Sequence, residues 1–378
     1  MRLLLLWSVG FAARVTLLAV PPLIPSMHRD LVLDETAIGA LGGLPILVLA
    51  GGTLLGSLVI ARLGARRAGV IGFVTVGVAG ALRGLGPSVP MLFAATIAMA
   101  VGVALAQLSI PSLVAAWEPG RIARATATYA NGMLFGEVAG AGLTATVLLP
   151  LASGSWEGAL ALWTLPVAAV ALALALQPDT ARPEIPVEWW PRWRDARVWT
   201  IAFGFGAASL AYWGANTHLP DFLHATGHAD DVPAALTSLN GFQLPASLVV
   251  AAAPALFVAR RWPFVAAGAV TLLCALGLVA TAGAASAAWT GVLGFVSALV
   301  FVLALALPPL LVPSHEVHRF SAAVFSVAYA FAFAGSLAAG ALWDATGIPA
   351  MAIAPIGAAG ALMAIVGSRL VLRAERAA

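Results

Sequence analysis

Long runs of apolar residues recur along the whole 378-residue chain, separated by short segments rich in glycine, proline and charge. Most of these runs approach or exceed the roughly 20 residues that an α-helix needs to cross a bilayer. The pattern therefore predicts an all-α polytopic membrane protein with twelve transmembrane helices. The expected spans are 3–27, 37–60, 68–86, 90–116, 124–150, 157–177, 198–219, 233–258, 263–283, 286–312, 321–343 and 350–371.

One long polar segment divides these spans into two groups of six. It reads PDTARPEIPVEWWPRWRDAR and is too rich in proline and charge to cross a membrane. Its tryptophans and arginines suit the depth of the lipid headgroups. We therefore expect an N-terminal six-helix bundle at 1–177, a cytoplasmic linker at 178–197 and a C-terminal six-helix bundle at 198–378.

Charge is scarce and unevenly distributed. Only 9% of the residues are charged and 61% are hydrophobic, which excludes an ordinary soluble domain. All 19 basic residues are arginines, and sixteen of them fall on one side if both termini are cytoplasmic. The net charge of +3 is thus explained by topology and anionic lipid, and nucleic-acid binding is not expected. The single cysteine, Cys274, permits no intramolecular disulfide.

Several local sequences resemble those of a known family. They include an arginine followed by prolines in the first span, LPILVLAGGTLLGSL in the second, GVALAQLSIPSLV in the fourth and FQLPASLVV in the eighth. Together with the two six-helix groups, they resemble the major facilitator superfamily, and within it the cyanate and nitroimidazole permease branch. The resemblance implies two pseudo-symmetric bundles, a monomer, and a place in a bacterial-type inner (plasma) membrane.

The loop between the second and third spans carries part of this resemblance. The stretch SLVIARLGARR keeps the glycine and the arginines of the family's gating loop. Ala61 stands where the family usually has an acidic residue. By the resemblance, the gating-loop residues are Arg62, Gly64, Arg66 and Arg67.

Arg14 is the first candidate for binding substrate. It lies about eleven residues into the first span, and at 1.5 Å per residue this puts it about 16 Å deep, near the middle of the bilayer. A guanidinium carries a permanent charge and several fixed donors, so it suits a small anion or a carboxylate. The alternative is a purely structural partner for Glu137.

Two further ionisable residues lie within predicted spans. Glu137, in the fifth span, is a candidate for proton coupling, because burial favours a neutral carboxyl group whereas a nearby arginine favours the charged one. The alternative is a static ion pair with Arg14. Arg83, near the outer end of the third span, either lines an outer vestibule or extends to the headgroups.

Polar and aromatic side chains within the spans could shape a substrate cavity between the halves. Each could equally serve as an interhelical hydrogen bond or packing residue. His218 is placed at the outer vestibule, and the histidines and aspartates that follow it match no metal motif, so no metal or cofactor is expected. The candidates for substrate binding, besides Arg14, are Gln107, Tyr129, Asn131, Tyr212, Trp213, Asn216, Gln243 and Tyr329.

The sequence thus predicts a secondary active transporter that moves a small anionic solute by alternating access, with coupling to protons left open. One alternative is proton-driven efflux of a neutral or weakly basic, nitroimidazole-like compound. An enzyme is not expected, because HExxH, GxSxG and paired DxxD motifs are missing from the sequence. The chain also lacks GxxxxGK[ST], so a gradient and not ATP would drive transport.

Overall fold

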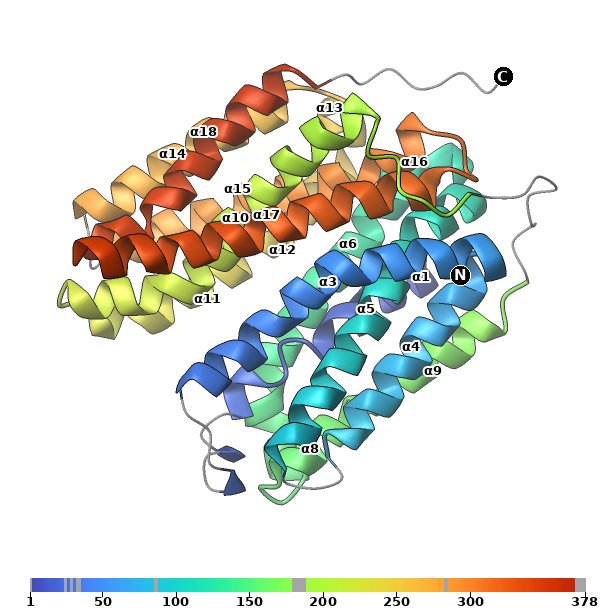
Figure 1. Cartoon of the computed structure of the whole chain (residues 1–378), viewed down its shortest axis with the longest axis horizontal. Helices are drawn as coiled ribbons and strands as arrows, with labels where there is room; N and C mark the ends of the chain where they lie inside the picture. Colours follow the sequence, from blue (N-terminus) through green and yellow to red (C-terminus); the bar gives the residue numbers. More distant parts are fainter. Residues whose placement is uncertain are drawn as a thin grey trace. The chain divides into compact units, whose positions relative to one another are not determined.

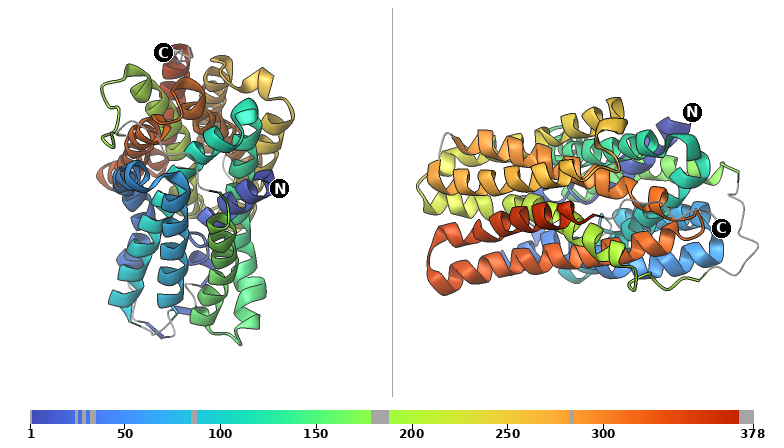
Figure 2. Two further views of the ribbon diagram at one scale, coloured as in Figure 1. Left: turned by 90° about the vertical axis from the view of Figure 1, so that its right-hand side faces the viewer. Right: turned by 90° about the horizontal axis from the view of Figure 1, so that it is seen from above.

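The computed structural model describes residues 2–23, 26–27, 30–31, 35–84, 88–178, 188–281 and 285–370. Every regular element in these ranges is a helix (Figures 1 and 2). The chain packs as two compact units, Met1–Pro191 with Val312–Ala322 and Arg192–Leu311 with Ala323–Ala378. The all-α fold class predicted from the apolar runs is confirmed.

The first unit is organised around α5. The α1 helix packs against α6, both α3 and α4 pack against α5, and α4 also packs against α9 (Figure 1). The element η3 is one turn of π-helix that continues α6. The bounds are α1 (Arg2–Val15), η1 (Pro21–Leu23), α3 (Glu35–Leu63), α4 (Ala65–Leu82), α5 (Val89–Trp117), η2 (Pro119–Arg121), α6 (Ile122–Leu143), η3 (Thr144–Leu148), α7 (Leu149–Leu151), α8 (Trp156–Leu162) and α9 (Thr164–Ala175).

The second unit is organised in the same way around α15. The helices α10, α11, α12 and α14 all pack against α15, and α18 packs against both α10 and α14. The first residues of α17, 317–322, belong to the first unit. The bounds are α10 (Ala196–Ala225), η4 (Ala229–Asp231), α11 (Val232–Gly241), α12 (Gln243–Ala252), α13 (Pro254–Phe257), α14 (Trp262–Thr281), α15 (Ser286–Ala306), α16 (Pro308–Leu311), α17 (Val317–Thr346), η6 (Pro349–Ala352) and α18 (Ala354–Ser368).

The two central helices, α5 and α15, are largely apolar and mostly buried, as expected of helices within a bundle. In each unit, one pair of helices approaches closely enough for the two backbones to touch at glycines. A methyl group on Gly72 of α4 or Gly102 of α5 would collide with the backbone of the other helix, and the same holds for Gly268 of α14 and Gly360 of α18. Small residues at such crossings allow the dispersion contacts that hold helices together in lipid.

Ten helical stretches in the described ranges are long and apolar enough to cross a membrane. Two of the twelve predicted spans are not among them, namely those of α1, which has 14 residues, and α10. The predicted first span, 3–27, is wrong as a continuous α-helix, because α1 ends at Val15 and residues 16–20 form turns. Prolines at 21 and 22 cannot donate the backbone bonds that would continue it.

Other predicted boundaries also need correction. The predicted span 233–258 is divided into α11, α12 and α13, and Pro245 explains the first break because its ring would clash with the carbonyl of Gly241. The α10 helix extends to Ala225, so the predicted end at residue 219 is too early and His224 lies in the last helical turn.

Candidate functional site

The α1 and α6 helices lie in unusually close contact. Any side chain larger than hydrogen at Gly132, Gly136 or Gly140 of α6 would meet a backbone carbonyl of α1. The carbonyls belong to residues 7, 11 and 15, so both series repeat every four residues along one helix face. Gly10 of α1 approaches the backbone of α6 in the same way. This contact fixes the register in which the polar side chains of the two helices meet.

Arg14 and Glu137 meet at this interface. The Nη1 atom of Arg14 lies 3.5 Å from Oε1 of Glu137, and the two side chains are only 2% and 6% exposed. The distance is longer than the 2.7–2.9 Å of a tight hydrogen bond between charged groups. The structure therefore holds a buried pair between a cation and a carboxylate, which the sequence had suggested as one alternative.

A second polar contact joins the same two helices about two turns away. The indole of Trp7 donates a hydrogen bond of 2.9 Å to Oδ1 of Asn131. The sequence analysis missed Trp7, because its position in a run of leucines looked purely apolar. Gln107 of α5 and Tyr129 of α6 are buried within the same unit, at 2% and 1% exposure.

Arg83 follows the end of α4 and is also buried, at 2% exposure. Its Nη2 atom donates to the backbone oxygen of Thr16, at 3.3 Å, just beyond the end of α1. The predicted alternative, in which the side chain extends to the lipid headgroups, is wrong, because the guanidinium points into the unit.

In the second unit, three candidates converge on one asparagine. The hydroxyl of Tyr212 donates to Oδ1 of Asn240 at 2.7 Å, and Nδ2 of Asn240 donates to Oδ1 of Asn216 at 3.1 Å. Gln243, which begins α12, donates to the backbone oxygen of Asn240 at 3.5 Å. Asn240 is thus the centre of a polar network where α10 meets the break between α11 and α12.

The remaining candidates of this unit lie apart from that network or at its edge. The ring of Trp213 packs edge-on against Tyr212, with centroids 5.1 Å apart. Tyr329 of α17 packs against Phe205 and Phe325 and is 1% exposed. Nε2 of His218 lies 2.9 Å from the backbone oxygen of Ser336, in α17.

The loop between α3 and α4 consists of Gly64 alone. Its φ of 85° lies in the left-handed region, which explains why a glycine stands there. Arg66 donates from Nη1 to the backbone oxygen of Ala175, at the end of α9, at 2.5 Å. Arg62 and Arg67 are exposed.

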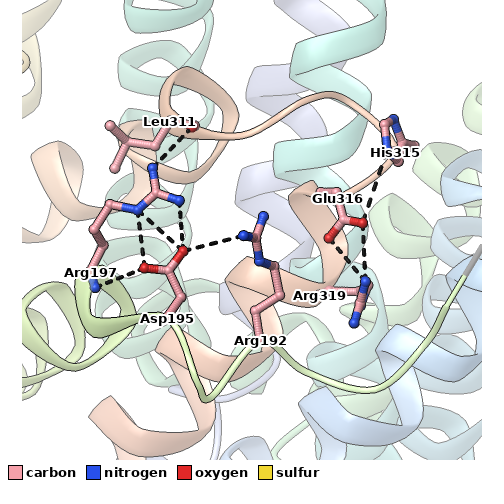
Figure 3. Close-up of polar contacts among 7 residues, drawn as sticks. All are labelled: Arg192, Asp195, Arg197, Leu311, His315, Glu316 and Arg319. Carbon is pink, nitrogen blue, oxygen red and sulfur yellow. Dashed lines mark hydrogen bonds and ion pairs between the residues drawn. The ribbon is translucent and has the colours of Figure 1, made fainter. Parts of the chain in front are cut away.

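The end of the predicted linker is held by the start of α17 and by α3. Arg319 contacts Oε2 of Glu188 at 2.6 Å and donates from Nε to the oxygen of Trp190 at 2.7 Å. It also pairs with Glu316, as Figure 3 shows. The hydroxyl of Ser57 in α3 donates to the oxygen of Trp189 at 2.5 Å. Residues 188–190 are therefore fixed to the first unit.

Asp195 caps the first turn of α10. Its carboxylate accepts from the backbone nitrogen of Arg197 at 2.9 Å and pairs with the guanidinium groups of Arg197 and Arg192 (Figure 3). Partial burial acts to raise the pKa of Asp195, but the hydrogen bonds from Arg197 and the two positive charges outweigh it, so the pKa lies below its ordinary value of 3.8.

Within the described ranges, no three His, Cys, Asp or Glu side chains are grouped as a metal site requires.

Comparison with known proteins agrees with this architecture. The model of the Major Facilitator Superfamily matches residues 6–340. The chain is 29% identical over 375 residues to the 2-nitroimidazole transporter of Escherichia coli (strain K12), a match that covers 95% of this chain and 92% of that protein. It is 24% identical over 245 residues to the cyanate transport protein CynX of the same organism, covering 63% and 62%. The branch suggested by the sequence motifs is thereby confirmed.

Solved structures share the fold at low sequence identity. FucP, a Major Facilitator Superfamily transporter in the outward conformation, gives a TM-score of 0.76 at 14% identity, covering 98% of this chain and 99% of that one. The human organic anion transporter MFSD10 (TETRAN) gives 0.77 at 12% identity, covering 98% of both chains. At such identities the likeness concerns the fold alone.

Proposed function

Because the chain belongs to the Major Facilitator Superfamily, we propose that it is a secondary transporter that carries a small anionic solute across a bacterial-type plasma membrane. In this proposal 1–177 and 198–378 are the two bundles, 178–197 is the cytoplasmic linker, and both termini are cytoplasmic. The bundles alternate in exposing the substrate site to the two sides of the membrane.

The buried guanidinium of Arg14 is the observation that carries the proposal. It is permanently charged, and its Nη1 atom lies 3.5 Å from Oε1 of Glu137. An anion that reached Arg14 would gain charged hydrogen bonds in a site from which water is excluded. Apart from Arg124, Glu157 and Arg369 at the span ends, the Arg, Asp and Glu residues in the predicted spans are Arg14, Arg83 and Glu137. These three sum to one positive charge, which favours a negatively charged solute.

Glu137 supplies the proposed coupling to protons. When a substrate anion takes over the guanidinium, the carboxylate loses a partner while it stays buried, and burial favours its neutral form. Substrate and proton would then bind together and cross together. A static pair that never separates is the alternative, and it predicts transport without proton movement.

Each bundle has candidate substrate contacts of its own. In the first, Gln107, Tyr129 and Asn131 accompany Arg14. In the second, the polar network around Asn240 would orient the solute through Tyr212, Asn216 and Gln243, with Trp213 and Tyr329 as walls. The outer vestibule is proposed for Arg83 and His218, and the gating loop for Arg62, Gly64, Arg66 and Arg67.

A second candidate function is proton-driven efflux of a neutral or weakly basic compound of nitroimidazole type. The observation that favours it is the similarity along nearly the whole chain to a 2-nitroimidazole transporter. In that case Glu137 carries the proton, and Arg14 only positions the side chain of Glu137.

Thermal stability of the purified chain separates the two functions. A ligand at a hundred times its Kd stabilises the fold that binds it by about 2.7 kcal/mol. We expect small carboxylates or cyanate to raise the melting temperature of the wild-type chain and of Arg124→Gln, an exposed control, by clearly more than that of Arg14→Gln. Stabilisation by nitroimidazoles alone, unchanged in Arg14→Gln, would overturn the anion proposal in favour of efflux.

A further inference from the structure

A second buried arginine of the first unit is only partly satisfied. Arg83 uses Nη2 for the backbone oxygen of Thr16, while its Nε and Nη1 atoms are buried without a hydrogen-bond partner in the described part of the chain. The hydroxyl of Thr16 is buried and lacks a partner in the same ranges. Hydrogen-bond donors of Arg83 and Thr16, two residues that are in contact, therefore lack acceptors in the described part of the chain.

The positions of the helix ends explain why Arg83 and Thr16 are in contact. The α1 helix ends at Val15, so Thr16 lies where the chain turns and its carbonyl is available to a side chain. Arg83 directly follows α4 and lies about 27 Å along that helix from Ala65. It is therefore at the opposite end of α4 from Arg66. Arg83 and Thr16 are thus brought together by the ends of two helices that run through the same unit.

In the described part of the chain, Arg83 forms no salt bridge with an acidic side chain, and the acidic side chains on nearby segments accept hydrogen bonds from other residues. Glu157, whose backbone lies against Gly84, accepts a hydrogen bond from Ser155. Asp30 accepts from the indole of Trp156. A guanidinium cannot lose its proton in a protein, and a buried charge without a counter-charge is strongly destabilising.

We propose that Arg83 and Thr16 form a binding site for one small anion, such as chloride, nitrate or formate. The anion accepts from Nη1 of Arg83 and from the hydroxyl of Thr16, and it neutralises the guanidinium. A water molecule could accept the same hydrogen bonds but would leave the charge uncompensated. The site uses other side chains than the pair of Arg14 and Glu137, and it does not depend on the proposed function.

The test uses a chain in which the other buried arginine is neutral. In the double variant Arg14→Gln/Glu137→Gln, Arg83 is the remaining buried arginine of the described first unit. Melting temperature is measured against sodium formate, nitrate or chloride, with sodium gluconate keeping the ionic strength constant. We expect a saturable rise in the double variant that disappears when Arg83→Gln is added and persists when the exposed Arg124→Gln is added instead.

Thr16→Val provides a variant that keeps the buried charge. It should raise the Kd of the anion about fivefold, the effect of losing one hydrogen bond. An absence of saturable stabilisation in the double variant would refute the site, as would an unchanged Kd in either the Arg83→Gln or the Thr16→Val chain. Failure of the proposed function is a different result, namely that neutralising Arg14 leaves substrate binding unchanged.

Discussion

Replacing Glu137 with glutamine removes the carboxylate that pairs with Arg14, while the guanidinium keeps its charge. Both side chains are nearly fully buried, so solvent screens the pair little. At 3.5 Å and an effective dielectric constant of about 20, Coulomb attraction between the two charges is about 5 kcal/mol. Breaking a buried pair from one side costs about 3–5 kcal/mol in measured cases, so we expect Glu137→Gln to lower the free energy of unfolding by about that amount.

Neutralising both residues should cost less than neutralising one. In Arg14→Gln/Glu137→Gln, two amides face each other and no buried charge is left, so we expect a coupling energy of about 3 kcal/mol between the two changes. Unfolding in mixed detergent micelles, monitored for all four chains of the cycle, measures this quantity. A coupling energy below about 0.5 kcal/mol would refute the reasoning, since it would mean that the two charges do not depend on each other.

Three other predictions concern the helix contact, the linker and the cap of α10. Gly136→Ala should destabilise the chain by about 1–3 kcal/mol in the same unfolding assay, because its methyl group meets the backbone of α1, whereas Gly142→Ala, on the same helix with open space around it, should be neutral or stabilising. Arg319→Gln should raise amide hydrogen exchange at residues 188–190 about tenfold, because it removes the contacts with Glu188 and Trp190. Glu188→Gln removes only an exposed carboxylate and should raise the exchange at most about threefold, and equal effects would contradict the role of Arg319 in holding these residues. The pKa of Asp195 is lowered on folding, so its contribution is present above pH 3.8 and is lost as the pH falls through the lower, folded pKa. The melting-temperature advantage of the wild-type chain over Asp195→Asn should therefore shrink between pH 6 and pH 3, and a constant difference would contradict this origin.

The fold was largely predictable because apolar runs report directly on membrane spans. The sequence could not locate where those spans cease to be regular helix. Thr16 has the same neighbours in sequence whether α1 continues or stops. The outcome depends on its contact with Arg83 and on two prolines several residues later. Breaks of this kind determine which backbone carbonyls are free to meet side chains.

The ionisable candidates were predictable for a different reason. A buried charge in a membrane protein needs a partner, and Glu137 offered one at a similar depth to Arg14. The register that makes them meet comes from the glycines of α6, whose pairing with α1 carbonyls requires the three-dimensional structure. Depth along a helix can be counted from the sequence, whereas the direction of a side chain cannot.

Arg83 and Asn240 illustrate that limit. From its position near a span end, Arg83 suited the headgroups as well as a vestibule, and only the turn after α1 explains its inward direction. Asn240 was one polar residue among many until the structure placed the side chains of Tyr212 and Asn216 against it. Networks of this kind join residues far apart in sequence, so single positions give little indication of them.

Uptake into proteoliposomes tests the central claim most directly. The purified chain is reconstituted with a pH-sensitive dye inside, and small carboxylates and cyanate are added outside with and without an imposed proton gradient. The account predicts saturable anion uptake accompanied by protons, abolished by Arg14→Gln and uncoupled from protons by Glu137→Gln. Anion uptake at the wild-type rate in Arg14→Gln would contradict it.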